Sequence, residues 1–263
     1  MELEQFRVSV VDRIATVTFD RPPVNAQNRR SREELTYIFD GLSDDPEVNC
    51  VILTGAGKVF SAGADIKERS DMTASRGDYL RHNRLTREFF YAVRDCAKPV
   101  ICAVNGPAIG AGFALMSNCD ILLASETAYI QMPEINVGLA GGAKFLELFP
   151  RTMARMMYFT GRPVSAQQLY SLGIVQACLP PEELMPAAQE IAGTHLAAAR
   201  SVVTALRATE EFDIILPSAA QALKAELIQK NPDLQATIIE VVDQTAIALA
   251  ARRGDLEREV ATI

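Results

Sequence analysis

The sequence predicts an α/β protein, and three patterns support this class. Short runs of almost uninterrupted apolar residues alternate with helical patterns up to about residue 150. Such runs are typical of parallel strands that are buried on both faces of a sheet. Beyond that point only helical periodicity remains. The 263 residues, 49% of them hydrophobic, suffice for one large domain or for one domain with a helical appendage.

The first elements expected along the chain are a β-hairpin and a helix. Residues 8–19 are rich in β-branched side chains and are interrupted at Asp12-Arg13, which predicts two strands joined by a tight turn. Pro22 ends the second strand. Ser31 is expected to cap a helix that runs to about Leu42, with acidic residues in its first turn.

Further apolar runs predict the buried strands of the sheet, at 50–54, 99–104 and 121–124. The polar stretch 67–83 is expected to form a surface loop. Helices are expected in the remaining periodic segments, at 84–96, 113–119, 151–160, 165–172, 181–208, 216–229 and 233–252.

Charge and cysteine usage exclude several classes of protein. With 26 basic and 33 acidic residues the net charge is −7, which argues against a general surface for nucleic acid or for anionic membranes. The five cysteines show no C-x-x-C spacing, so neither a disulfide framework nor a zinc site is expected. The first residues lack the pattern of a signal peptide, and the apolar window 99–118 is interrupted by Asn105 and Pro107. A cytoplasmic enzyme is therefore expected.

Two glycine-rich segments suggest where the chemistry lies. Phe60-Ser-Ala-Gly-Ala-Asp-Ile66 and Asn105-Gly-Pro-Ala-Ile-Gly-Ala-Gly112 each follow an apolar run and consist largely of small residues. Turns of this kind let a backbone approach a ligand closely. Two of them can aim two peptide N–H groups at one carbonyl oxygen, which is the arrangement of an oxyanion hole.

Glu134 is the side chain best suited to move a proton. It lies beside a proline in an apolar run, where loss of solvent raises the pKa of a carboxyl group towards neutrality. An isolated glutamate of this kind is more often a turn residue satisfied by backbone N–H groups, but the two glycine-rich segments favour catalysis. For His82 and His195 a structural or exposed role is favoured. A dinucleotide fingerprint, a P-loop and a serine-nucleophile elbow are all missing from the sequence.

These residues resemble the crotonase (enoyl-CoA hydratase/isomerase) superfamily, with motifs in the family's order over roughly residues 8–190. The resemblance implies a crotonase-like spiral of ββα units over residues 1–190. It also implies an α-helical C-terminal region over 191–263 that serves in trimerisation or as a lid, and a homotrimer or a dimer of trimers. The matching motifs are Arg21-Pro-Pro-Val-Asn-Ala26, the two glycine-rich segments, Cys119-Asp120, Pro133-Glu134 with Gly138, and Thr160-Gly-Arg-Pro-Val-Ser-Ala-Gln167.

The resemblance also implies an acyl-CoA substrate and a set of site residues. The thioester oxygen would lie between the N–H groups of Ala64 and Ala111, and Glu134 would act as acid and base. Neither a metal nor a cofactor is implied, since coenzyme A is part of the substrate, and the activity would belong to fatty acid metabolism. Contacts with the substrate and its CoA are implied for Ala26, Ala62, Ala64, Asp65, Ile66, Lys67 and Ala111.

One departure from the family pattern leaves the reaction open. The first of the two glutamates that family hydratases use falls on Ala114. Loss of one general acid/base typically costs ~10²–10⁴ in rate. The sequence is compatible with both isomerisation and hydration by Glu134. The alternatives are an enzyme for decarboxylation or C–C hydrolysis and a protein that binds CoA without catalysis. The nearest candidates in sequence to replace the missing carboxylate are Asp65, Glu68, Asp71 and His82.

Overall fold

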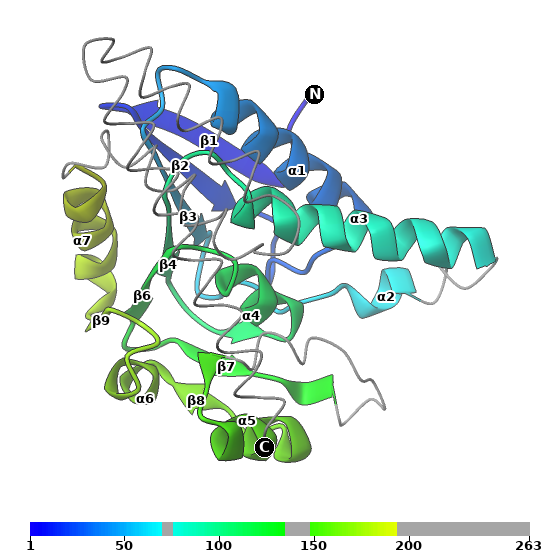
Figure 1. Cartoon of the computed structure of the whole chain (residues 1–263), viewed down its shortest axis with the longest axis vertical. Helices are drawn as coiled ribbons and strands as arrows, with labels where there is room; N and C mark the ends of the chain where they lie inside the picture. Colours follow the sequence, from blue (N-terminus) through cyan, green and yellow to red (C-terminus); the bar gives the residue numbers. More distant parts are fainter. Residues whose placement is uncertain (70–75, 135–147, 194–263) are drawn as a thin grey trace, which may run out of the picture. The chain divides into compact units, whose positions relative to one another are not determined.

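The computed structural model describes residues 1–69, 76–134 and 148–193, and the fold is given for these ranges. Their main element is a six-stranded sheet in the order β1-β2-β3-β4-β6-β9 (Figure 1). Only the pair β1–β2 is antiparallel; the other four pairs are parallel, as predicted. The strands are β1 (Phe6–Val11), β2 (Ile14–Phe19), β3 (Cys50–Gly55), β4 (Val100–Val104), β6 (Ile121–Ser125) and β9 (Ala177–Leu179).

The N-terminal hairpin has the turn that the sequence predicts. Asp12 and Arg13 both have positive φ, 50° and 65°, and such turns match the right-handed twist of the flanking strands. At the other end of the pair, the rings of Phe6 and Phe19 stack with centroids 4.6 Å apart. The hairpin forms one edge of the sheet.

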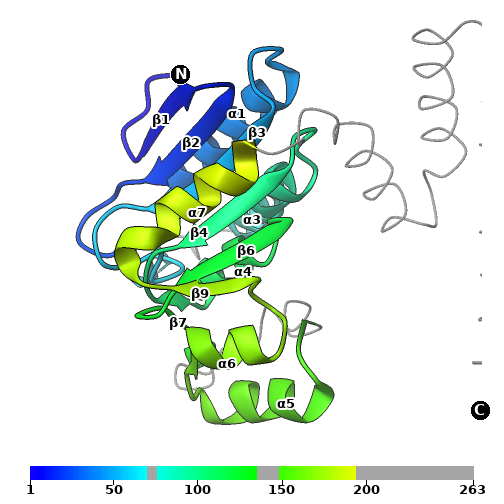
Figure 2. The ribbon, with the colours of Figure 1, turned by 90° about the vertical axis from the view of Figure 1, so that its left-hand side faces the viewer.

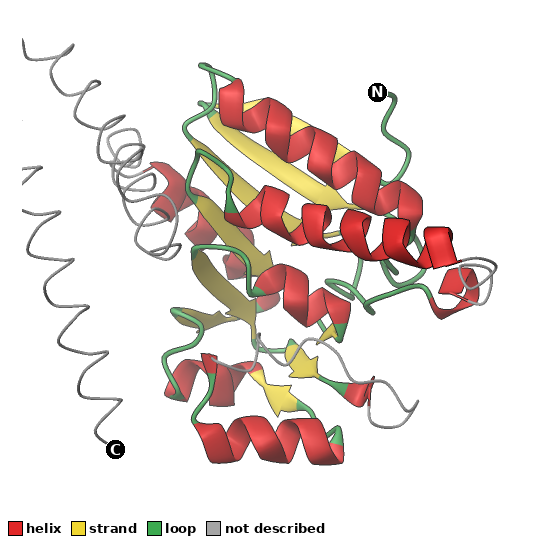
Figure 3. Cartoon of the chain, turned by 45° about the vertical axis from the view of Figure 1, so that its right-hand side comes forward, coloured by secondary structure: helices red, strands yellow, loops and turns green. Residues whose placement is uncertain are grey.

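Helices cover both faces of the sheet, which explains the uninterrupted apolar strands. α1 (Arg29–Asp44) and α3 (Arg76–Arg94) lie side by side on one face (Figure 3), and α7 (Pro181–Gly193) packs on the other (Figure 2). Alternate residues of a strand point to opposite faces. Accordingly, Val51 and Leu53 of β3 join the core on the α1 side, while Ile52 joins the core beneath α7.

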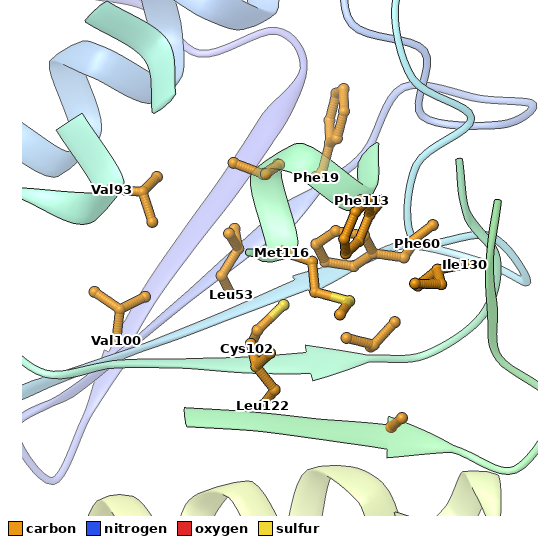
Figure 4. Packing of buried hydrophobic residues seen from close by; sticks show 14 of the residues in the cluster. Phe19, Leu53, Phe60, Val93, Val100, Cys102, Phe113, Met116, Leu122 and Ile130 are labelled. Carbon is orange, nitrogen blue, oxygen red and sulfur yellow. The ribbon is translucent and has the colours of Figure 1, made fainter. Parts of the chain in front are cut away.

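A short helix and a second, smaller sheet complete the described part. Phe113 and Met116 of α4 (Ala111–Met116) pack with Phe60, Leu53 and Cys102 in the core (Figure 4). The remaining elements are α2 (Ile66–Arg69), the three-stranded sheet of β5 (Ala108–Ile109), β7 (Tyr129–Gln131) and β8 (Val164–Ser165), and the helices α5 (Arg151–Thr160) and α6 (Ala166–Ser171).

Two local predictions were wrong. The residue that caps α1 is Asn28, whose side chain accepts from the Ser31 N–H at 2.8 Å, while the Ser31 hydroxyl accepts from the Asn28 N–H at 2.9 Å. Ser31 is thus the third residue of a reciprocal capping box. In addition, residues 67–69 and 76–83 of the expected loop are helical, as parts of Ile66–Arg69 and Arg76–Arg94. The buried Phe89 and Val93 fix α3 against the core, and adding further turns to a packed helix is easy even for polar residues.

The chain divides into two compact units, Met1–Ala199 and Arg200–Ile263. The helices expected over 216–229 and 233–252 lie outside the described residues, and the boundary expected at residue 190 stays a prediction. Within the described ranges, no helix is both long enough and apolar enough to cross a bilayer.

Candidate active site

The first glycine-rich turn follows β3 and is held by buried polar side chains. The Asn25 amide donates to the carbonyl oxygens of Val59 at 2.8 Å and Ala56 at 3.0 Å. Ser61 pairs with Ala108 in a parallel bridge, which places the turn beside β5. Residues 31 or more positions apart are thereby joined around one turn.

The two glycine-rich turns touch each other at Gly63. This residue has a φ of +86°, a conformation that favours glycine. A Cβ at this position would lie 2.5 Å from the Ile109 carbonyl oxygen and 3.1 Å from the Ala111 nitrogen. Only glycine allows so close an approach, so the predicted neighbourhood of the two turns is present.

The peptide geometry gives the directions of two N–H groups in these turns. The Gly63 carbonyl oxygen accepts from the Gln27 N–H at 2.7 Å. In a trans peptide the next N–H points the opposite way, so the Ala64 N–H points away from Gln27. Ala111 is the first residue of α4, and its N–H therefore has no acceptor within the helix.

Glu134 lies against the turn that precedes α4. Pairing of Ile109 with Gln131 in β5 and β7, together with the 2.8 Å bond from the Gly110 N–H to the Gln131 carbonyl, brings the end of β7 to this point. Gly110 has φ +51°, and a Cβ on it would lie only 2.7 Å from Glu134 Oε1. The carboxylate thus lies beside the residue that precedes Ala111.

The surroundings of Glu134 favour its protonated form. The side chain is half-buried, and Oε2 is buried with no hydrogen-bond partner among the residues that the structure describes. Burial raises the pKa of Glu134 above its ordinary value, although a hydrogen bond from its own backbone N–H acts in the opposite direction. A carboxyl group with a raised pKa is a stronger base than an exposed glutamate, so it is suited to accept a proton during a reaction.

The structure offers no described carboxylate in the place of Ala114. Ala114 is buried in α4, one turn after Gly110. Of the substitutes suggested by the sequence, Asp65 is paired with Arg21 at 2.7 Å, and both carboxylate oxygens of Glu68 accept from the Arg29 N–H at 2.9 Å.

The other two suggested substitutes are His82 and Asp71. His82 lies on α3 with Nδ1 3.4 Å from Arg32 Nη1. Asp71, like His195, lies outside the described residues.

Most residues expected to contact CoA lie between Ala62 and Lys67, in the first turn and at the start of α2, and this segment is called the strip below. Ala64, Ile66 and Lys67 are exposed, with Ile66 73% exposed although its side chain is apolar. Arg21 ties the strip together, because its guanidinium donates to the Ala26 carbonyl at 2.8 Å and to Asp65.

Asp65 of this strip is anchored in its ionised form. Burial would raise its pKa, but bonds from Arg21 and from the backbone N–H groups of Lys67 and Glu68 outweigh burial and lower it. Ala62, also in the strip, donates its N–H to the Val24 carbonyl at 3.0 Å.

The described ranges contain no cluster of side chains that could bind a metal ion. Groups of three or more histidine, cysteine, aspartate or glutamate side chains placed to hold an ion do not occur there. The cysteines are free thiols, and burial raises the pKa of Cys50 to about 12, which makes it unreactive at neutral pH.

Sequence reasoning missed several residues that shape this site. The special roles of Gly63 and Gly110 depend on contacts with residues far along the chain, and so does that of Arg21. Gln27 was also missed. The available signal was a polar residue directly after the Asn25-Ala26 motif. Gln27 is fully buried, and a buried polar side chain needs hydrogen-bond partners.

The chain is similar in sequence to one family of known proteins. Residues 10–241 match the model of the family described as enoyl-CoA hydratase/isomerase. A (7aS)-7a-methyl-1,5-dioxo-2,3,5,6,7,7a-hexahydro-1H-indene-carboxyl-CoA hydrolase of Rhodococcus jostii is 41% identical over 182 residues, which cover 69% of this chain and 70% of that protein. A short-chain-enoyl-CoA hydratase of Clostridium acetobutylicum is 37% identical over 198 residues, 73% of this chain and 75% of the relative.

Solved structures show the same fold. An enoyl-CoA hydratase/isomerase from Mycobacterium paratuberculosis has a TM-score of 0.71 at 29% identity, and the match covers 90% of this chain and 98% of that one. The α/β fold class and the resemblance in the sequence are both confirmed.

Proposed function

Because this chain belongs to the enoyl-CoA hydratase/isomerase family, we propose that it forms and protonates the enolate of an acyl-CoA thioester, with Glu134 as its single acid/base. One observation carries this proposal. Glu134 Oε1 lies 2.7 Å from the Cβ position of Gly110, directly before the first N–H of α4, which has no acceptor within the helix. A proton acceptor and an oxyanion donor are therefore adjacent.

The N–H groups of Ala64 and Ala111 would hold the thioester oxygen. Contact between the two turns at Gly63 supports this role, since it leaves the two peptides close together. Negative charge grows on the oxygen as the enolate forms, and each preorganised donor typically stabilises it by about 3–4 kcal/mol. Both donors are main-chain groups, so alanine supports the same chemistry as glycine.

Glu134 would take a proton from the carbon next to the thioester or from the γ-carbon and return it elsewhere. Its Oε2, which has no partner in the described ranges, is available for that proton. The raised pKa makes Glu134 a stronger base than an exposed glutamate, which favours the step in which it takes the proton.

The exposed strip would bind the CoA portion. Ile66 presents an exposed apolar side chain against which the adenine ring of CoA can pack. The small side chains of Ala62 and Ala64 leave room for the rest of the CoA molecule. Lys67 adds a positive charge for phosphate. The ion pair of Arg21 and Asp65 keeps this strip in place.

Among the described residues Glu134 is the one carboxylate placed at this point, which favours double-bond isomerisation over hydration, because the methyl group of Ala114 cannot hold water. A second candidate is C–C hydrolysis, which the 41% identical Rhodococcus jostii relative favours, since its name describes a hydrolase of a bicyclic dioxo CoA thioester. In this reaction Glu134 would take a proton from water as the water oxygen adds to a ketone carbon β to the thioester. The bond between the α- and β-carbons would then break, giving a carboxylic acid and the thioester enolate. The same two N–H groups would hold that enolate until its α-carbon takes up a proton.

A panel of CoA thioesters in ¹⁸O-water tests these reactions by mass spectrometry. An unlabelled product with a shifted double bond reports isomerisation, uptake of label by an enoyl-CoA reports hydration, and a labelled ring-opened acid from a bicyclic dioxo thioester reports C–C hydrolysis. Tight CoA binding without any product would contradict the proposal and indicate a non-catalytic binding protein.

Gly110→Ala is expected to lower turnover by about a hundredfold, the typical cost of misplacing a reacting group by roughly 1 Å. The new methyl group would occupy space only 2.7 Å from Glu134 Oε1 and would displace the carboxylate. Steady-state kinetics and thermal unfolding of both proteins provide the measurement.

Gly57→Ala is the matched control, because it carries the same kind of positive φ, +74°, with no described atom within 4 Å of its Cβ position. It should lose stability but keep its turnover. Equal turnover in Gly110→Ala and Gly57→Ala would contradict the placement of Glu134.

A further inference from the structure

Gln27 connects the two proposed oxyanion donors. We propose that it is a positioning residue that sets the relative placement of the Ala64 and Ala111 N–H groups, an inference that rests on the proposed function. Its side chain is fully buried, so it acts through these peptides and not by touching the substrate.

The backbone of Gln27 fixes the first donor. Its N–H donates to the Gly63 carbonyl at 2.7 Å, and its carbonyl accepts from the Asp65 N–H at 2.9 Å. These two bonds hold the peptides on both sides of Ala64. Since each peptide is planar and trans, they fix the direction in which the Ala64 N–H points.

The side chain of Gln27 fixes the second donor. Nε2 donates to the Ala111 carbonyl at 3.0 Å, across 84 positions of the sequence. The same nitrogen lies 3.3 Å from Ser61 Oγ, which in turn accepts from the Gly63 N–H at 3.2 Å. One amide group therefore holds both turns.

Gln27 is itself held rigidly. The Arg32 guanidinium, also buried, donates to the Gln27 carbonyl at 3.2 Å from α1. Motion of one donor relative to the other would require this bonded set to break.

A purely structural role explains Gln27 poorly. Its Oε1 is buried and has no hydrogen-bond partner among the described residues, an arrangement that costs stability. An apolar side chain of similar length would avoid this cost. What only glutamine supplies at this position is the donor nitrogen that reaches Ala111.

Carbonyl infrared spectroscopy of bound acetyl-CoA, labelled with ¹³C at the thioester carbon, tests the inference. Acetyl is a small acyl group, so its binding depends little on the shape of the acyl pocket. Polarisation by two N–H donors lowers the carbonyl stretching frequency of the wild-type complex relative to free acetyl-CoA. In Gln27→Met, which keeps the side-chain length, we expect most of this shift to be lost.

The turnover of Gln27→Met should fall about tenfold to a hundredfold, as expected when reacting groups are misplaced, with acetyl-CoA affinity nearly unchanged. Gln5→Met is the matched control. Gln5 also has a buried Oε1 without a described partner, but it lies before β1 at the edge of the sheet. It should keep both the wild-type frequency and turnover. Gln27→Leu provides a second apolar variant if methionine prevents folding.

A folded Gln27→Met or Gln27→Leu protein with the wild-type carbonyl shift and turnover would overturn this inference while leaving the proposed function intact. Absence of a shift in the wild-type complex would instead overturn the oxyanion hole, and with it the proposed function.

Discussion

Glu134→Gln is expected to reduce turnover by ~10²–10⁴-fold or more, with acyl-CoA affinity nearly unchanged. The amide has the shape of the carboxyl group but cannot take up a proton, while the donors at Ala64 and Ala111 are untouched. Single-turnover kinetics and a direct binding measurement separate the two effects. Turnover equal to that of the wild type would contradict the proton-transfer role.

The same variant is expected to be more stable than the wild type at neutral pH. A raised pKa means that the folded state favours the protonated carboxyl group, so the contribution of Glu134 to stability is present below the ordinary glutamate pKa, about 4.3, and is lost as the pH rises through the raised value. Glutamine does not titrate and avoids this loss. The gain in melting temperature should therefore appear above the raised pKa and vanish in acid.

Glu190→Gln is the control for this stability effect, since Glu190 is exposed on α7. Its melting temperature should differ little from that of the wild type at either pH. A Glu134→Gln protein that is less stable than the wild type at neutral pH would contradict the desolvated state of the carboxyl group.

Ala114→Glu is expected to introduce hydratase activity, raising the hydration rate by ~10²–10⁴-fold, the usual contribution of one general acid/base. Ala114 lies one turn after Gly110 on the same face of α4, and helical side chains tilt towards the N-terminus of their helix. The new carboxylate would therefore approach Glu134, and the two groups can hold one water between them.

Uptake of ¹⁸O into an enoyl-CoA measures the gain in Ala114→Glu. Ala114→Gln is the control, because it adds similar bulk without a base and should not hydrate. The buried position, 3% exposed, makes some loss of stability certain, so thermal unfolding accompanies the kinetics. A folded Ala114→Glu protein without hydration would show that the missing glutamate does not decide the reaction.

Much of the sheet was predictable because its strands carry local patterns. The runs at 50–54, 99–104 and 121–124 became β3, β4 and β6, since strands with both faces covered must be apolar throughout. The start of α3 was not predictable in this way. Its first turns are polar, and its helical state depends on packing further along the same helix.

The candidate site was likewise predictable only where local motifs indicate its residues. Motifs in the sequence pointed to Ala64, Ala111 and Glu134, but not to the contacts that arrange them. The bond from Gln27 to Ala111 joins residues 84 positions apart, and the contact of Gly110 with Glu134 requires β5 and β7 to pair. No local propensity encodes such distances, because they arise only when the strands assemble.

The proposed donors at positions 64 and 111 are backbone groups of alanines, and this limits what mutagenesis can reveal about them. A systematic alanine scan leaves both positions unchanged, and the strongest stabilising groups would be invisible to it. Their importance would emerge only from neighbours such as Gly63, whose Cβ position lies 3.1 Å from the Ala111 nitrogen. Replacing single peptide links by esters, which deletes one N–H at a time, would probe them directly.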